Sequence, residues 1–268
     1  MKLKIFGLQG KEKKEIDLPV QFSEETRSDI IKRAVQSLFS FKRQPYGTDP
    51  RAGKNAAATL SRKRKDYKSG YGSGRSRVPR KTLTRRGTQF YFVGAVAPGT
   101  RKGRRAHPPK AEKIREEKIN KKERRKAIRS AIASTLDKNL VQKRGHILGN
   151  NYPFILSSEF ESLKKTKEVK NALHSLDLEQ EIERCNTRKI RAGKAKMRNR
   201  RYRTKKGPLI VVSNNCPLMK SARNILGIDV VNVKSLNVHY LAPGSALGRL
   251  TLWTEGAIDM LSKEQLYV

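Results

Sequence analysis

Apolar positions near the start of the chain follow the periods of strands and helices. Short apolar runs at 2–8 and 16–22 flank the charged segment KEKKE and predict two short strands or a loose hairpin. Ser23 resembles a helix start. The residues behind it predict a helix over about 24–40, because apolar side chains repeat at helical spacing at Ile30, Ile31, Ala34, Val35, Leu38 and Phe39.

The C-terminal part alternates apolar runs with helical patterns. Buried strands are predicted at LIVVS (209–213), IDVVNV (228–233) and RLTLW (249–253). Helices are predicted over 217–226, 235–242 and 254–263, with Thr254 as the N-cap of the last. Strands that alternate with helices favour a parallel sheet. The predicted fold class is α/β: a Rossmann-like, mostly parallel sheet with flanking helices, plus a long basic extended internal loop.

The segments between these ends carry weaker patterns. Residues 111–136 lack Gly and Pro and predict a long helix whose first half is almost wholly charged. PFIL at 153–156 predicts a short strand, and amphipathic helices are predicted over 157–176 and 176–190.

Residues 42–110 have no sustained period. They hold 20 Lys and Arg against two acids, Asp49 and Asp66, with many glycines and prolines. Only FYFVGAVA at 90–97 has the character of a buried strand or an apolar plug. Compact domains rarely contain a structureless connection longer than about 12–15 residues. We therefore predict a globular α/β domain formed by 1–44 and 107–268, and an extended internal loop at 45–106.

The cost of ordering this loop indicates what it is for. Fixing some 65–70 residues costs on the order of 70–140 kcal/mol of backbone entropy. The few apolar side chains recover only about 1.5–3 kcal/mol each on burial. Alone, the segment is expected to be disordered, so a fixed shape requires a partner.

The charge balance identifies the class of that partner. The chain has 268 residues, 61 Lys and Arg against 24 Asp and Glu, and a formal charge of +37. Nucleic acid is the commonest polyanion that removes the self-repulsion of such a chain. A membrane is the other candidate, but no run approaches the roughly 18 apolar residues of a spanning helix, and the start lacks a signal peptide. Two widely spaced cysteines favour reducing cytosol over a disulfide framework or a zinc site.

The residue types of the loop suit RNA. Arginines form forked bonds to phosphates and stack on bases, glycines let the main chain approach a phosphate ridge, and aromatic rings stack on unpaired bases. A second acid-free stretch, 184–206, holds 12 Lys and Arg. The ordinary alternative for both stretches is a solvated surface or a localisation tract, although such tracts are normally terminal.

Signals for enzymes are weak. GYGSG at 70–74 neither follows a predicted strand nor opens a helix, GKS and GKT are absent, and the four histidines are scattered. No cofactor and no metal ion are therefore predicted. Two alternatives stay open: an RNA-modifying or RNA-processing enzyme with a basic arm, and a histone-like DNA-compacting protein.

Three segments resemble one family. SRKRKDYKSGYGSGRSRVPR (61–80), GAVAPGTRKGRRAHPPK (94–110) and IRAGKAKMRNRRYRTKKGPLIVV (190–212) closely resemble the L-four family of large-subunit ribosomal proteins, in its archaeal and eukaryotic form. The likeness continues through LIVVSNNCPLMKSARNILGIDVVNV to RLTLWTEGAIDML. The chain ends at Val268 without the long tail of eukaryotic members, which favours an archaeal source.

The resemblance implies a ribosomal role rather than an enzyme. Family members have a globular α/β domain on the solvent side of the large subunit, and a long internal loop that enters ribosomal RNA in the cytoplasmic ribosome. The loop tip, which we place around 65–80, helps to form the narrow part of the nascent-peptide exit tunnel beside the protein L-twenty-two. The family also acts early in assembly.

Site residues follow from the resemblance and the charge pattern together. Tunnel-facing positions are expected at Tyr71, Gly72, Ser73 and Gly74. RNA contacts of the loop are expected at Arg62, Lys63, Arg64, Lys65, Lys68, Arg75, Arg77, Arg80, Lys81, Arg85 and Arg86, and nearer its base at Arg101, Lys102, Arg104, Arg105 and His107. The globular domain is expected to bind RNA through Arg198, Arg200, Arg201, Arg203, Lys205 and Lys206.

Overall fold

The computed structural model describes residues 1–67 and 69–268. It contains two compact units. The globular unit consists of Met1–Lys42 and Glu116–Val268, and the inserted unit consists of Arg43–Arg115.

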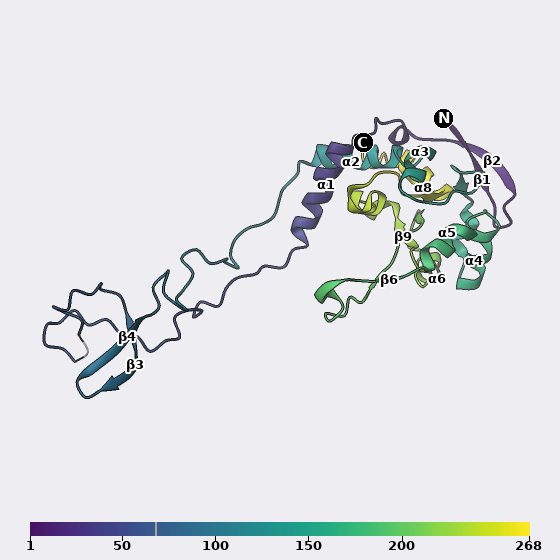
Figure 1. The fold of residues 1–268 in the computed structure, drawn as a ribbon. Helices are drawn as coiled ribbons and strands as arrows, with labels where there is room; N and C mark the ends of the chain where they lie inside the picture. Colours follow the sequence, from purple (N-terminus) through teal and green to yellow (C-terminus); the bar gives the residue numbers. More distant parts are fainter. Residues whose placement is uncertain (68) are drawn as a thin grey trace. The chain divides into compact units, whose positions relative to one another are not determined.

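A six-stranded sheet forms the centre of the globular unit (Figure 1). Its spatial order is β2-β1-β5-β10-β8-β9. β2 pairs antiparallel with β1, and the other strands run parallel to their neighbours. The predicted α/β class with a mostly parallel sheet is therefore confirmed. The strands are β1 (Lys2–Phe6), β2 (Glu12–Asp17), β5 (Ile155–Leu156), β8 (Leu209–Val212), β9 (Asp229–Asn232) and β10 (Thr251–Thr254).

Helices cover both faces of the sheet because successive strand residues point to opposite faces. In β8, Leu209 and Val211 join one core cluster, whereas Ile210 and Val212 join the other. The first cluster is covered by α1 (Ser28–Phe41), α2 (Lys121–Ala133), α7 (Val238–Leu241) and α8 (Glu255–Lys263). The second is covered by α3 (Lys138–Lys143), α4 (Thr166–His174), α5 (Glu179–Asn186) and α6 (Leu218–Ser221).

The start of α8 is formed as predicted. The Thr254 hydroxyl accepts a hydrogen bond of 3.3 Å from the amide of Ala257, which satisfies one free donor of the first turn. The neighbouring Trp253 is only 2% exposed and packs edge-on against Phe22, with ring centroids 5.1 Å apart.

The N-terminal hairpin differs from the prediction in its second strand. β2 lies on the charged residues 12–17, whereas 20–22 form a 3-10 turn. Because β2 is an edge strand with exposed side chains, charged residues are tolerated there. The predicted cap is also wrong: α1 begins at Ser28, and the Ser23 hydroxyl donates to the carbonyl of Val20.

Most predicted helices are shorter than their patterns: the helices predicted over 176–190, 217–226 and 235–242 are formed only as α5, α6 and α7. Two others differ more. The helix predicted over 111–136 is formed only as α2, and within 111–120 only Ile119 packs against the core. The helix predicted over 157–176 is divided into a 3-10 turn at Ser158–Ser162 and α4. There, Phe160 and Leu163 are buried beside the sheet, and the chain between the two helical pieces is extended.

The inserted unit contains a hairpin of which the sequence indicated only the second strand. β4 (Gln89–Gly94) covers part of the apolar run, and β3 (Arg80–Arg86) pairs with it antiparallel. The strand β3 was missed because its sequence, RKTLTRR, is mostly charged.

The segment that enters the inserted unit, around residues 48–53, contacts the segment that leaves it, around residues 104–109. The Thr48 amide donates to the Pro109 carbonyl at 3.0 Å. At Gly53, with φ of 77°, an added Cβ would lie 2.5 Å from the backbone of Arg104. Among the described residues, neither core cluster takes a member from the inserted unit.

Candidate nucleic-acid interface

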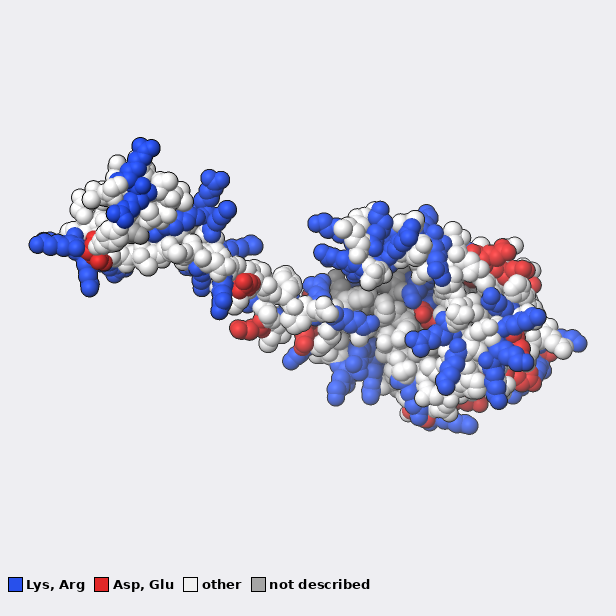
Figure 2. All heavy atoms as spheres, turned by 90° about the horizontal axis from the view of Figure 1, so that it is seen from below, with Lys and Arg blue, Asp and Glu red and all other residues white. Residues whose placement is uncertain are grey.

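The described cations of the inserted unit have no carboxylate partner within ion-pair distance. Among its described residues, 43–67 and 69–115, no Lys or Arg forms an ion pair, whereas many surface cations of the globular unit do. Figure 2 shows Lys and Arg side chains over the inserted unit with few acidic ones between them. This unit therefore carries uncompensated positive charge.

Most of the predicted loop contacts lie at the surface. The exposed residues are Arg62, Lys63, Arg64, Lys65, Arg75, Arg77, Arg85, Arg86, Arg101, Lys102, Arg105 and His107. Three are partly buried: Arg80, Lys81 and Arg104. Lys68 lies outside the described residues.

Two of these arginines also hold the local backbone. Arg80 donates to the carbonyl and the hydroxyl of Ser76, at 2.6 and 3.0 Å. Arg85 donates to the carbonyl of Gly87 at 2.7 Å, in the turn between β3 and β4. Since a guanidinium has five N–H donors, both side chains keep donors for a further partner.

Arginines and aromatic rings alternate around the hairpin. Arg64 lies over the ring of Tyr71 with 5.1 Å to its centroid, and Arg75 lies 5.7 Å from the centroid of Phe92. Arg85 lies 5.6 Å from the centroid of Phe90. Such a surface offers rings for unpaired bases and guanidinium groups for phosphates.

The turn Tyr71–Gly74, predicted to face the tunnel, is exposed throughout. Gly72 and Gly74 have φ of 79° and 65°, and nothing lies within 4 Å of an added Cβ at either. The two glycines are thus required by conformation rather than by crowding.

A second cluster lies where the two chains of the inserted unit meet. Tyr46, Arg105, His107 and Arg115 line an open cavity of about 780 Å³. The guanidinium of Arg115 lies 3.7 Å from the centroid of Tyr46 and donates to the Tyr46 carbonyl at 3.1 Å.

The second basic stretch forms a small hairpin on the globular unit. Its strands are β6 (Lys189–Ile190) and β7 (Tyr202–Arg203), with the label β6 marking it in Figure 1. The predicted contacts Arg198, Arg200, Arg201 and Arg203 are exposed. Lys205 is partly buried, and Lys206 pairs at 2.9 Å with Asp229, so Lys206 already has a carboxylate partner within the protein.

Arg184 joins the two ends of the segment that forms this hairpin, a role that the sequence did not indicate. Its guanidinium donates to both carboxylate oxygens of Glu181 at 2.7 Å and to the carbonyl of Lys206 at 2.8 Å. Glu181 is fully buried and accepts two further hydrogen bonds, from the amide of Ile147 and from Nδ1 of His146. One buried carboxylate therefore fixes the side chain that joins the two ends of the basic stretch.

The pKa values of this cluster follow from burial and from Arg184. Burial lowers the pKa of His146 and outweighs the effect of Glu181. Burial alone would raise the pKa of Glu181, but the hydrogen bonds from Arg184, His146 and the Ile147 amide lower it. At neutral pH the cluster holds a neutral imidazole and a carboxylate paired with a guanidinium.

A second buried arginine supports the same hairpin. Arg249 has no exposed surface and donates to Asp229 at 2.6 Å and to the Gly207 carbonyl at 2.9 Å. Burial lowers the pKa of Arg249 despite the nearby carboxylate. Asp229 thus receives both Arg249 and Lys206, which ties the end of the basic stretch to β9.

At the sheet edge where α/β proteins commonly bind ligands, this structure has the side chain of Glu161. In open parallel sheets ligands bind at the carboxyl ends of strands, where the following helices go to opposite faces. Here β8 leads to α6 and β10 to α8, on opposite faces. Between these strand ends Glu161 accepts hydrogen bonds from the Ser213 amide, the Ser213 hydroxyl and the Thr254 hydroxyl, at 2.9, 2.7 and 2.6 Å. The negative charge of the Glu161 carboxylate repels a phosphate group at this position.

Other kinds of site are not seen in the part of the chain that the structure describes. Residues 1–67 and 69–268 contain no group of three or more metal-ligating side chains. None of the helices formed by these residues has the length and apolar character needed to cross a bilayer.

Comparison with known proteins gives one consistent result. Residues 16–264 match the family described as "Ribosomal protein L4/L1 family". The chain is 47% identical over 268 residues to "Large ribosomal subunit protein uL4" of Nanoarchaeum equitans, with 100% of each chain covered. It is 45% identical over 267 residues to the protein of that name in Archaeoglobus fulgidus, and 44% identical over 265 residues to that of Methanocaldococcus jannaschii. These two alignments each cover 98% of this chain and 99% of the relative.

Proposed function

The chain belongs to the ribosomal protein L4/L1 family, and on that premise we propose that it is a structural constituent of the large ribosomal subunit that binds large-subunit ribosomal RNA. The observation that carries the proposal is the absence of ion pairs among the described cations of the inserted unit. Self-repulsion among such cations destabilises a compact unit, and a bound polyanion removes this cost.

The two basic surfaces have different parts in this proposal. The inserted unit enters the RNA and holds it by phosphate contacts and base stacking, and the β6–β7 hairpin gives the globular unit its own RNA surface. Both contribute early in assembly, when ribosomal RNA is still folding.

The tip of the inserted unit has a second role in the proposal. The exposed turn Tyr71–Gly74 lines part of the nascent-peptide exit tunnel, next to the protein L-twenty-two. Two glycines with open surroundings leave this turn narrow, which suits a tunnel wall. The partners are therefore large-subunit RNA, neighbouring ribosomal proteins and the growing polypeptide, in the cytoplasmic ribosome.

The alternatives from sequence are less well supported. An RNA-modifying enzyme on this sheet needs a nucleotide site at the carboxyl ends of the strands, where Glu161 is held by Ser213 and Thr254. A DNA-compacting protein would bind duplex DNA and ribosomal RNA with equal affinity, so competition between the two nucleic acids distinguishes it.

The salt dependence of binding tests the proposal. If about eight phosphates are neutralised, the logarithm of affinity for large-subunit RNA falls against the logarithm of salt with a slope of roughly −6 to −7. Replacing Arg75, Arg77, Arg85 and Arg86 by Gln should make the slope shallower by about 3.

A matched control removes the same charge elsewhere. Lys4, Arg27, Lys165 and Lys234 of the globular unit are paired with carboxylates, and their replacement by Gln should leave the slope unchanged. A flat slope for the natural protein, or equal effects of both quadruple variants, would refute the proposal.

A further inference from the structure

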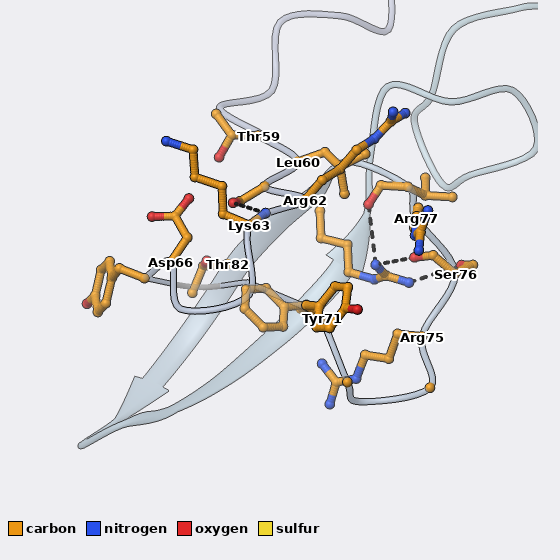
Figure 3. Close-up of a pocket in the computed structure, with 18 of the residues that line it drawn as sticks. Thr59, Leu60, Arg62, Lys63, Asp66, Tyr71, Arg75, Ser76, Arg77 and Thr82 are labelled. Atoms are coloured by element: carbon orange, nitrogen blue, oxygen red, sulfur yellow. Dashed lines mark hydrogen bonds between the residues drawn. The ribbon is translucent and has the colours of Figure 1, made fainter.

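The inserted unit contains a cavity of about 1060 Å³ beside its hairpin (Figure 3). Its walls come from the segments 57–67 and 70–82 and from Phe92 of β4. Small-ligand pockets in proteins measure roughly 300–1,000 Å³. The cavity therefore has room for one nucleotide together with its flanking phosphates.

Aromatic rings form one part of the wall. Tyr71 and Phe92 line the cavity, and each has an arginine over its ring, Arg64 and Arg75 respectively. Tyr71 is 46% exposed, so a partner can reach its ring. A base that stacks on such a ring gains a planar contact that does not depend on its identity.

Positive charge forms another part. Arg62, Lys63, Arg75 and Arg77 line the cavity without a carboxylate within ion-pair distance among the described residues. Arg80 also lines it but holds the turn through Ser76. Asp66 is the one acidic residue in the wall, and Figure 3 shows it on the opposite side from Arg77. The cavity is thus polarised, with its most positive side at Arg75 and Arg77.

The backbone leaves this positive side open. Gly72 and Gly74, on the turn that leads to Arg75, have no atom within 4 Å of an added Cβ. A phosphate can therefore approach the main chain of this turn without meeting a side chain.

We propose that this cavity holds one unstacked nucleotide of the bound RNA, with its base on Tyr71 and Phe92 and its phosphate at Arg75 and Arg77. The inference rests on the proposed function and adds a ligand class to it: a single-stranded nucleotide, read by stacking and charge. Tyr71 then anchors the tip in RNA, and only the rest of its turn is left for the tunnel wall. A peptide is the competing occupant, but the excess of cations favours a phosphodiester.

The test uses the full-length protein bound to large-subunit RNA. Short-wavelength ultraviolet light followed by mass spectrometry should cross-link Tyr71 or Phe92 to one nucleotide. Loss of one base stack lowers affinity by about 5- to 150-fold, so Tyr71→Leu should weaken RNA binding at least about fivefold and remove the cross-link at position 71. Arg75→Gln should weaken binding and leave the cross-link.

The matched control is Tyr91→Leu. Tyr91 is 45% exposed, lies next to Phe92 on β4 and does not line the cavity, so this variant should bind like the natural protein. If Tyr71→Leu and Tyr91→Leu bind alike and Tyr71 cross-links to no nucleotide while the natural protein binds RNA, the cavity proposal fails and the proposed function stands. If Tyr71 cross-links to a nascent peptide in stalled ribosomes instead, a peptide is the occupant. If the natural protein does not bind the RNA, both proposals fail.

Discussion

The guanidinium of Arg184 donates a hydrogen bond of 2.8 Å to the carbonyl of Lys206, 22 residues further along the chain. This bond joins the two ends of the basic stretch whose middle forms the β6–β7 hairpin. The same guanidinium is held by the buried carboxylate of Glu181. The orientation of the exposed arginines on the hairpin therefore depends on a side chain that itself points into the protein.

Replacing Arg184 by Ala should destabilise the globular unit. It leaves the Glu181 carboxylate buried with only His146 and the Ile147 amide as partners, and breaking a buried pair in this way costs about 3–5 kcal/mol. The single tryptophan, Trp253, lies in the core and reports urea unfolding through its fluorescence.

Arg188→Ala is the matched control for this change. Arg188 is an exposed cation of the same hairpin, 5.8 Å from the centroid of Tyr202, so its loss should change stability by less than about 0.5 kcal/mol. Equal effects of the two variants would show that Arg184 does not close the hairpin.

Acid should destabilise the globular unit through His146 and Glu181. The pKa of each group is lower in the folded protein than its ordinary value. Each therefore binds fewer protons folded than unfolded, and the free energy of unfolding rises with pH. The His146 contribution is complete above its unfolded pKa of about 6.5 and is lost as pH falls through its folded pKa.

The measurement is urea unfolding between about pH 7.5 and pH 5.5, which brackets the unfolded pKa of histidine. The free energy of unfolding should fall toward the acid end, and His146→Gln should fall less over the same interval. Stability that stays constant or increases toward pH 5.5 would contradict the assignment of a neutral buried imidazole.

Removal of the loop should leave the globular unit folded. Replacing residues 46–105 by a short Gly-Ser linker deletes no member of either core cluster among the described residues. Because α1 and α2 pack on the same face of the sheet without help from the insertion, the unfolding midpoint seen by Trp253 should stay near that of the full chain. Loss of the far-ultraviolet circular dichroism and of the cooperative Trp253 fluorescence transition would mean that the core extends into the insertion.

The α/β core was predictable because burial on two faces leaves a strong pattern. Residues 209–212 are all apolar and form β8, in which every residue is buried, as a fully covered parallel strand requires. The run at 228–233 also formed a strand, β9, although it lies at the sheet edge and includes Asp229 and Asn232. By contrast, β2 and β3 consist largely of charged residues, since an edge strand and a surface hairpin bury little. Their formation is decided by pairing partners, which local composition does not describe.

The sequence predicted the positive charge of the candidate interface but not the buried ion pairs that hold the β6–β7 hairpin in place. The exposed cations form dense runs that the sequence displays directly. Asp229 and Arg249 are 20 residues apart and meet only in the fold, as do Glu181 and His146, 35 residues apart, so no spacing indicated these pairs. Only the pair of Glu181 with Arg184 has the i,i+3 spacing of helix neighbours. The pairing of Lys206 with Asp229 shows the same limit, because a lysine in a basic run gives no sign of its acidic neighbour.

Amide hydrogen exchange of residues 43–115 tests the central claim, that the inserted unit acquires its fixed shape from RNA. A lone two-stranded hairpin is at best marginally stable in water, so β3 and β4 of the free full-length protein should exchange within seconds while β8 and β10 stay protected. Binding of large-subunit RNA should then slow exchange across β3 and β4. Slow exchange there in the free protein, at a level comparable to the central strands, would contradict the account.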